Sequence, residues 1–217
     1  MKTGITGGVA YGQSTGDFAD EPQQCVNFVE CHDNHTLWDK IVLSSEGKSE
    51  AHRKAMHRLA SAMVLTSQGI PFIHAGQEFM RTKDGVENSY KSPVEINRMD
   101  WERCAANTSD VAYMKRLIAL RKGHPAFRLR TAEEIRTRLV FEQAPAGAVA
   151  YTLRNHAGGD PAEHLYVLYN ANPDGASLNL PALGEWSILF GDELVTGVAG
   201  GKLTVRGLGM VVLAVQP

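Results

Sequence analysis

The spacing of hydrophobic residues changes near residue 125 and divides the chain into two parts. Over residues 50–66 and again over 110–122, apolar side chains recur at helical spacing, with polar ones such as His57 on the opposite face, which predicts two amphipathic helices. From residue 135 onward, short runs alternate apolar and polar positions between Gly, Pro, Asn and Asp, a pattern typical of antiparallel strands. The expected strands are 138–143, 149–154, 165–169, 187–190 and 202–215.

Two further apolar runs in the first part predict parallel strands. Residues 23–30 form a short run that stops at the polar cluster 32–35, as a buried strand does when it ends at a functional rim. A second run at 70–73 follows the helix 50–66, and the three elements together make a βαβ unit. The long polar stretch 74–101 comes next, and a loop of that length indicates a site.

The predicted fold class is therefore α/β followed by all-β. Residues 1–125 form the α/β domain and residues 126–217 a C-terminal antiparallel β-sandwich, with the boundary at residues 122–125. Two parallel strands alone leave a sheet edge and a sheet face uncovered, whereas a closed (β/α)8 barrel has eight strands. The first part is thus either a small sheet of another kind or the end of something longer.

Composition narrows the partners without identifying one. The 217 residues are 43% hydrophobic and 21% charged with a net charge of −2, which is ordinary for a globular protein. No basic excess points to nucleic acid, and no run approaches the ~18 apolar residues of a membrane span, so neither partner is expected. The N-terminus lacks a signal-type apolar core, and localisation stays open. The three cysteines form no CxxC pair, so neither a disulfide framework nor a metal site is expected.

The candidate chemistry lies at the ends of the two predicted parallel strands. His32 and Asp33 are adjacent there, and such a pair is more often hydrogen-bonded for structure than used in catalysis. Cys31 precedes His32, but adjacent strand residues point to opposite faces, which disfavours a Cys–His nucleophile. A metal-dependent phosphohydrolase of His–Asp type is a further alternative, and it predicts an all-helical fold.

Longer strings around this pair resemble a known family. The string VECHDNHTLWDK at 29–40 resembles the fourth signature region of the α-amylase clan, glycoside hydrolase family 13, in the form used by type I pullulanases. The similarity extends to essentially the whole chain, is specific over residues 4–101 and is looser in the sandwich. Its other strings are GITG at 4–7, DFA at 17–19, QGIPFIHAGQEF at 68–79, RTK at 81–83, ENSYKSP at 87–93 and INRMDW at 96–101.

The resemblance implies a debranching glycosidase that cleaves α-1,6-glucosidic linkages in pullulan, starch or glycogen limit dextrins by a retaining mechanism. Retaining glycosidases use a nucleophilic carboxylate and a carboxylic acid about 5 Å apart. This clan adds a third acidic residue, and by the resemblance Asp33 is that transition-state stabiliser, a fixed negative charge beside an oxocarbenium-like centre. His32 is then expected to hydrogen-bond sugar hydroxyls in the central subsite. The further substrate-binding candidates are Asn34, Asn88, Tyr90 and Asn97.

Other residues of the resembling strings receive a structural interpretation or mark a departure. Trp101 is interpreted as a buried anchor of the 74–101 loop rather than a stacking platform for glucose. Glu78 is interpreted either as a loop brace or as a residue that orients cleft groups. The family usually has an Asp after the Ser-Pro of this loop, whereas this chain has Val94, which puts one substrate contact in doubt.

The resemblance also implies that the chain holds only part of an active site. The family's nucleophile and general acid belong to motifs on the fourth and fifth barrel strands, and no Asp or Glu here lies in a matching context. The first part then corresponds to the last two βα units of the barrel, the remainder is expected upstream or in trans, and the isolated chain is expected to be inactive.

An α-glucan is the expected partner. No cofactor is required, and calcium, which some relatives bind, is not indicated because the acidic residues are scattered. The alternative function is a non-enzymatic α-glucan-binding module, in which the sandwich works alone and presents exposed aromatic side chains around Trp186.

Overall fold

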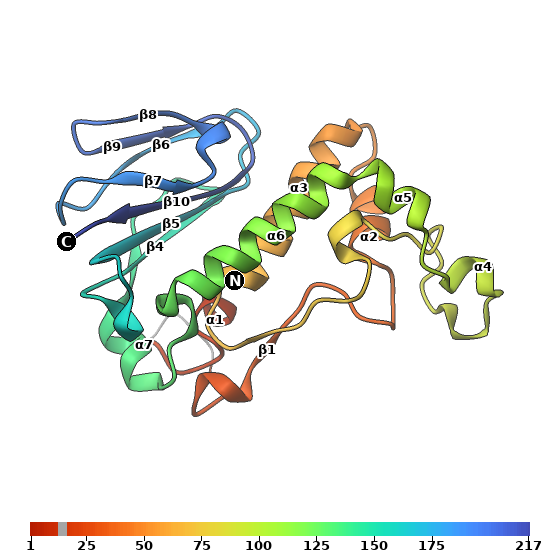
Figure 1. Cartoon of the computed structure of the whole chain (residues 1–217), viewed down its shortest axis with the longest axis horizontal. Helices are drawn as coiled ribbons and strands as arrows, with labels where there is room; N and C mark the ends of the chain where they lie inside the picture. The colour runs from red at the N-terminus through yellow and green to blue at the C-terminus, as the bar shows by residue number, and fades with distance from the viewer. Residues whose placement is uncertain (13–16) are drawn as a thin grey trace.

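The computed structural model describes residues 1–12 and 17–217 and has a mainly helical part followed by antiparallel sheets (Figure 1). The segment that carries α4 and α5 lies at the end of the molecule away from the sheets (Figure 1). The α-helices are α1 Lys2–Ile5, α2 Leu37–Ser44, α3 Glu50–Thr66, α4 Val94–Asn97, α5 Trp101–Ala106, α6 Thr108–Gly123 and α7 Ala132–Arg138. The 3-10 helices are η1 Pro22–Gln24, η2 Gln77–Phe79, η3 Ser89–Lys91, η4 Pro125–Arg128, η5 Ala157–Gly159 and η6 Asp192–Leu194.

Helix α3 spans the range that its apolar spacing predicts. It begins where the Ser49 hydroxyl accepts a hydrogen bond from the His52 N–H at 3.2 Å, and it packs against α6 and against the sheet. The expectation that His57 lies on a polar outer face is wrong, because α2 and α6 cover that face and leave His57 only 3% exposed. Burial lowers the pKa of His57 to about 4, so its imidazole is neutral at pH 7.

The first part contains one short parallel pair, β1 Val26–Asn27 and β2 Ile70–Pro71, with Val26 opposite Ile70. The predicted parallel pairing is therefore confirmed. The predicted burial of the first strand is wrong, since Val26 is 50% and Phe28 is 55% exposed. Within the described residues this sheet has two strands, so each strand has a single neighbour and their apolar side chains lack a covering layer.

The second part consists of two antiparallel sheets. The five-stranded sheet has the order β3-β4-β5-β10-β7, and the three-stranded sheet has the order β6-β9-β8. The expectation of one strand over 202–215 is wrong, because Gly207 turns the chain with a φ of 67° and separates two strands that join different sheets. The strands are β3 Leu139–Glu142, β4 Ala148–Leu153, β5 His164–Asn170, β6 Ala176–Asn179, β7 Ser187–Phe190, β8 Val195–Ala199, β9 Lys202–Val205 and β10 Gly209–Val215.

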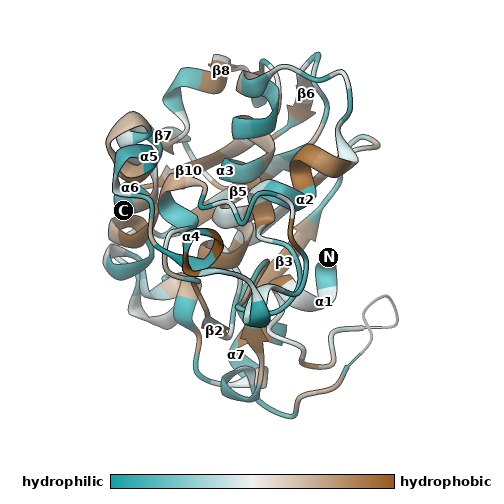
Figure 2. Ribbon diagram, turned by 90° about the vertical axis from the view of Figure 1, so that its right-hand side faces the viewer, coloured by the Kyte–Doolittle hydropathy of each residue, from teal (hydrophilic) through white to brown (hydrophobic). Residues whose placement is uncertain are grey.

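The five-stranded sheet is the middle layer of the molecule. Along β5, Leu165, Val167 and Tyr169 pack with the helices, whereas Tyr166 and Leu168 pack with the three-stranded sheet. This alternation follows from the two-residue period of a strand. Figure 2 shows the apolar colouring of β10 beside the helices α3 and α6. The division at residues 125 and 126 stays a prediction, since one apolar cluster joins helices and sheet.

A buried cation holds the junction between α3 and β2. The Arg121 guanidinium in α6 donates to the carbonyl oxygens of Leu65 at 2.9 Å and of Ser67 and Gly69 at 2.8 Å. These carbonyls belong to the end of α3 and the turn before β2, where no helical partner remains for them. Arg121 thereby fixes the direction in which β2 leaves the helix.

Candidate functional site

The predicted site residues lie on two loops that follow the parallel strands. The loop after β1 carries residues 31–35, and the segment 74–101 follows β2. The two loops are joined, since the His35 Nε2 lies 3.1 Å from the carbonyl oxygen of Gly85. Because parallel strands bring their carboxyl ends to one edge, the pairing explains why residues distant in sequence meet here.

His32 and Asp33 stand at the surface of this edge. The side chain of His32 is 85% exposed and that of Asp33 is 63% exposed, and their Nε2 and Oδ2 atoms lie 3.5 Å apart. The carboxylate is therefore open to a ligand rather than consumed by a buried partner. A carboxylate held at a strand end in this way can stabilise positive charge on a bound molecule.

Glu30 lies beneath this pair, and sequence reasoning assigned it no role. The residue is 4% exposed, and its carboxylate accepts a hydrogen bond from the backbone N–H of Leu37 at the start of α2. Burial raises the pKa of Glu30 to about 7, against the opposing effects of the Leu37 N–H and of Arg81. The signal that could have revealed it is an acidic residue at the end of an otherwise apolar run.

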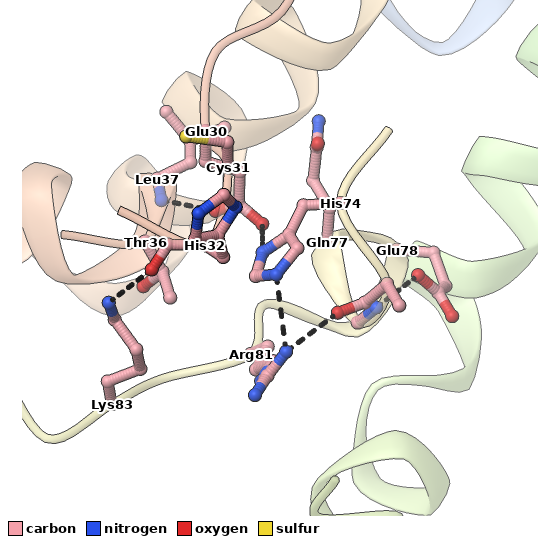
Figure 3. A network of polar contacts seen from close by, with 12 residues as sticks. Glu30, Cys31, His32, Thr36, Leu37, His74, Gln77, Glu78, Arg81 and Lys83 are labelled. Atoms are coloured by element: carbon pink, nitrogen blue, oxygen red, sulfur yellow. Dashed lines mark hydrogen bonds and ion pairs between the residues drawn. The ribbon is translucent and has the colours of Figure 1, made fainter. Parts of the chain in front are cut away.

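His74 and Arg81 continue this network into the second loop (Figure 3). The Arg81 Nη1, which can only donate, lies 3.4 Å from the His74 Nε2, so that nitrogen accepts. The His74 Nδ1–H then donates to the Glu30 Oε1 at 3.3 Å. Burial, Arg81 and Lys83 lower the pKa of His74, which agrees with a neutral ring in this position. Arg81 also donates to the backbone carbonyl of Asn97.

The remaining predicted binding residues divide into two groups. Asn34, Asn88 and Tyr90 are exposed, and Tyr90 is 74% exposed, so these side chains are available to a ligand. Asn97 is half-buried, and its amide donates to the Ser89 carbonyl and accepts from the Ser89 hydroxyl, both at 2.8 Å. That pairing braces η3 against α4 and favours a structural role for the Asn97 side chain.

Two interpretations of the 74–101 loop, those of Trp101 and Glu78, are resolved by its contacts, and the expectation about Val94 stays a prediction. The expectation of a buried Trp101 is wrong, because the residue is 68% exposed and only touches Phe79 with a 6.2 Å separation of ring centroids. Glu78 accepts from the Gly76 N–H at 3.0 Å, which is the brace of its own turn. Val94 is 69% exposed at the start of α4.

One group of metal-donor atoms occurs among the described residues. The donor atoms of Cys31, His32 and Asp33 all lie within 4.8 Å of one another, and His32 and Asp33 are open to solvent. They are consecutive residues of the candidate glucan loop, so their proximity follows from sequence and gives no separate indication of a metal. The expectations of no required cofactor and of no calcium site stay predictions.

The alternatives from the sequence fare differently. All three cysteines are free, and Cys25 is buried while Cys31 and Cys104 are half-buried. The His–Asp phosphohydrolase predicts an all-helical fold, and the antiparallel sheets of the second part exclude it.

The glucan-binding module predicts exposed aromatic side chains near Trp186. Instead the Trp186 ring packs on Tyr166, and its N–H donates to the Pro181 carbonyl at 3.1 Å. In the described part of the chain, no helix is both long and apolar enough to cross a membrane.

Comparison with known proteins places these features in a family. Residues 135–193 match the family model described as "Pullulanase, all-beta domain". The pullulanase of Bacillus subtilis strain 168 is 45% identical over 161 residues, which cover 74% of this chain and 22% of that protein. The crystal structure of apo pullulanase from Paenibacillus barengoltzii superposes with a TM-score of 0.98 at 68% identity, covering 100% of this chain and 33% of that one.

The sheets, the loop residues and these similarities define the chain as a member of the glycoside hydrolases. Within that class it belongs to the pullulanase family and corresponds to the C-terminal portion of a type I pullulanase. The chain spans about a fifth to a third of the length of these relatives. A further structure, the Paenibacillus barengoltzii pullulanase in complex with maltohexaose and α-cyclodextrin, is 67% identical with a TM-score of 0.98.

Proposed function

We propose that this chain supplies one wall of the active site of a debranching hydrolase that cleaves α-1,6-glucosidic linkages in pullulan or limit dextrins. In this proposal β1 and β2 are the last two strands of a (β/α)8 barrel, and Asp33 is the carboxylate that stabilises the oxocarbenium-like transition state. His32, Asn34, Asn88 and Tyr90 contact the glucan. The nucleophile and the general acid lie outside these 217 residues.

The observation that carries the proposal is the exposure of residues on and next to the parallel strands β1 and β2. Its carboxyl ends present an exposed His32–Asp33 pair, while its apolar side chains Val26, Phe28 and Ile70 are half or nearly half exposed. Exposed apolar residues on a sheet face mark a surface that another layer covers. The relative solved with maltohexaose and α-cyclodextrin supports an α-glucan as the ligand.

Asp33 acts by charge and position in this mechanism. When the bond from the sugar ring to the leaving oxygen breaks, positive charge develops on the ring, and a fixed carboxylate beside it lowers the barrier. His32 orients the same sugar through its hydroxyls. Two carboxyl groups about 5 Å apart on other barrel strands complete a retaining reaction.

The test is a chimera in which this chain replaces the matching third of the Paenibacillus barengoltzii pullulanase. We expect the chimera to release reducing sugar from pullulan and the Asp33→Asn variant to lose at least about 100-fold in kcat. Asp174→Asn is the matched control, because Asp174 is an exposed carboxylate in the turn before β6. A fully active Asp33→Asn chimera would refute the assigned role.

The isolated chain gives the complementary measurement. Incubated with pullulan, it is expected to release no more reducing sugar than its Asp33→Asn variant, because one carboxylate cannot perform the two-step displacement. Turnover that depends on Asp33 in the isolated chain would contradict the assignment of nucleophile and acid to other segments.

A further inference from the structure

Lys83 is a buried cation next to the candidate catalytic loop. The residue is 2% exposed, and its ammonium donates to the carbonyl oxygens of His32 at 3.3 Å, Asn34 at 2.5 Å and Glu87 at 3.0 Å. An ammonium has three N–H donors, so this set uses all of them. Among the described residues, no carboxylate forms an ion pair with it. Lysine is rarely buried without a carboxylate, which makes the arrangement unusual.

The three carbonyl groups converge from two separate loops. Two of them belong to the loop after β1, and the third belongs to Glu87, which directly follows the turn that Lys83 begins. Asn34, whose carbonyl oxygen binds the ammonium, has a φ of 60°, and Asp84, which follows Lys83 in the chain, has a φ of 53°, so each loop contains a left-handed residue. Such residues persist where the surrounding contacts determine the backbone.

The backbone of Lys83 is held by Asp39 of α2. Its backbone N–H donates to the Asp39 Oδ2 at 2.8 Å, and the Thr82 hydroxyl donates to the Asp39 Oδ1 at 2.5 Å. Asp39 is 4% exposed in the first turn of α2, where the Thr36 hydroxyl accepts from its N–H at 3.1 Å. Helix α2 therefore anchors the lysine backbone, and the lysine head group holds the loop that precedes the same helix.

These contacts hold the loop by its backbone and leave its side chains free. His32 and Asp33 remain 85% and 63% exposed although the carbonyl oxygens on both sides of Asp33 are bound. We propose that Lys83 is a positioning residue, a built-in cation that fixes the 32–34 loop so that Asp33 is presented to the glucan. The glucan part of this inference rests on the proposed function, whereas the ordering of the loop does not.

Charge is the property that this role requires. Lys83→Met keeps the unbranched stem but removes all three donors and leaves three carbonyl groups without their partner. Lys83→Ala removes the stem as well and leaves space that n-propylammonium can fill with its charge in the same place. Neutral n-propanol has the same number of non-hydrogen atoms as n-propylammonium without the charge and is the control additive.

The experiment measures backbone order by nitrogen-15 relaxation in the intact chain. For the Asp33 and Asn34 amides we expect order parameters near 0.85 in the wild type, a fall below about 0.6 in Lys83→Met, and recovery in Lys83→Ala with n-propylammonium but not with n-propanol. Lys40→Met is the matched control, since Lys40 is an exposed lysine in α2. Amides of β10 report whether the fold is intact.

Each outcome decides the inference. Wild-type order at Asp33 in a folded Lys83→Met chain overturns it. If Lys83→Met unfolds as a whole, folding of Lys83→Ala is compared in the two additives, and equal recovery with n-propanol overturns the inference. If the chimera of the proposed function is inactive while the loop order responds as expected, the glucan assignment fails and the positioning of the loop by Lys83 stands.

Discussion

Replacing Glu30 by Gln tests whether burial governs the ionisation of this carboxyl. The folded carboxyl keeps its proton up to a pKa of about 7, whereas an unfolded glutamate loses it near 4.5. Between these values Glu30 binds a proton in the folded chain and not in the unfolded chain, so its contribution to the free energy of unfolding falls as pH rises. At about 1.4 kcal/mol for each tenfold difference in proton affinity, the contribution of Glu30 to wild-type stability falls by about 3 kcal/mol between pH 4 and pH 8.

A glutamine side chain at this position cannot ionise and therefore removes this loss. Its amide oxygen still accepts from the Leu37 N–H, but its NH2 group faces the His74 Nδ1–H, which costs about 1–2 kcal/mol at every pH. The pH-independent cost changes the offset between the two chains and leaves the difference in slope unaffected. The free energy of unfolding of Glu30→Gln minus that of wild type is expected to rise by about 3 kcal/mol from pH 4 to pH 8.

Urea unfolding followed by circular dichroism at pH 4, 5, 6, 7 and 8 measures this difference. Glu95→Gln is the matched control, because Glu95 is exposed in α4 and its replacement is expected to give a constant difference. A difference for Glu30→Gln that stays constant over this range would refute the claim that burial dominates over Arg81 and the Leu37 N–H.

Two further variants test the buried groups around this region. His57→Gln should remove a contribution of opposite sign, because the pKa of His57 is about 4 in the folded chain and 6.5 in the unfolded chain. The contribution of His57 to wild-type stability therefore rises by about 3 kcal/mol as pH rises through that window. Urea unfolding of the variant should lack this gain. A variant slope equal to wild type would contradict the burial of a neutral imidazole. Arg121→Met should lower the free energy of unfolding at pH 7 by about 3 kcal/mol, because two buried carbonyl groups and one half-buried carbonyl group lose their donor. Exposed Arg136→Met should change it by less than about 0.5 kcal/mol.

The sequence predicted the elements whose stability is local and missed the contacts that are not. Helix α3 begins at Glu50 and ends at Thr66 as expected, because its apolar stripe lies within the segment and its cap Ser49 directly precedes it. Strand β7 also has the expected limits, Ser187 and Phe190. His57 was misplaced because a helix with two buried faces looks amphipathic when only its strongest stripe is counted.

The sequence predicted the motif of the candidate site but not the residues that hold its loop in place. His32 and Asp33 follow from a contiguous string, whereas Lys83 meets that string from 49 and 51 residues away. No periodicity links such positions, and a lysine gives no sign in sequence that it is buried. Trp101 was misjudged for a related reason, since the size of a side chain predicts burial only when the surface that covers it is known.

Arg121 and Lys83 solve one physical problem in the same way. Each lies where the chain leaves a regular element and several carbonyl oxygens point into a space that backbone N–H groups do not reach. A single cation with several donors satisfies such a cluster more completely than neutral side chains with one donor each. Because the Lys83 ammonium binds carbonyl oxygens and no carboxylate, it does not neutralise the negative charge of Asp33 through an ion pair. The same arrangement that orders the loop thus leaves its one acidic side chain free to face a ligand.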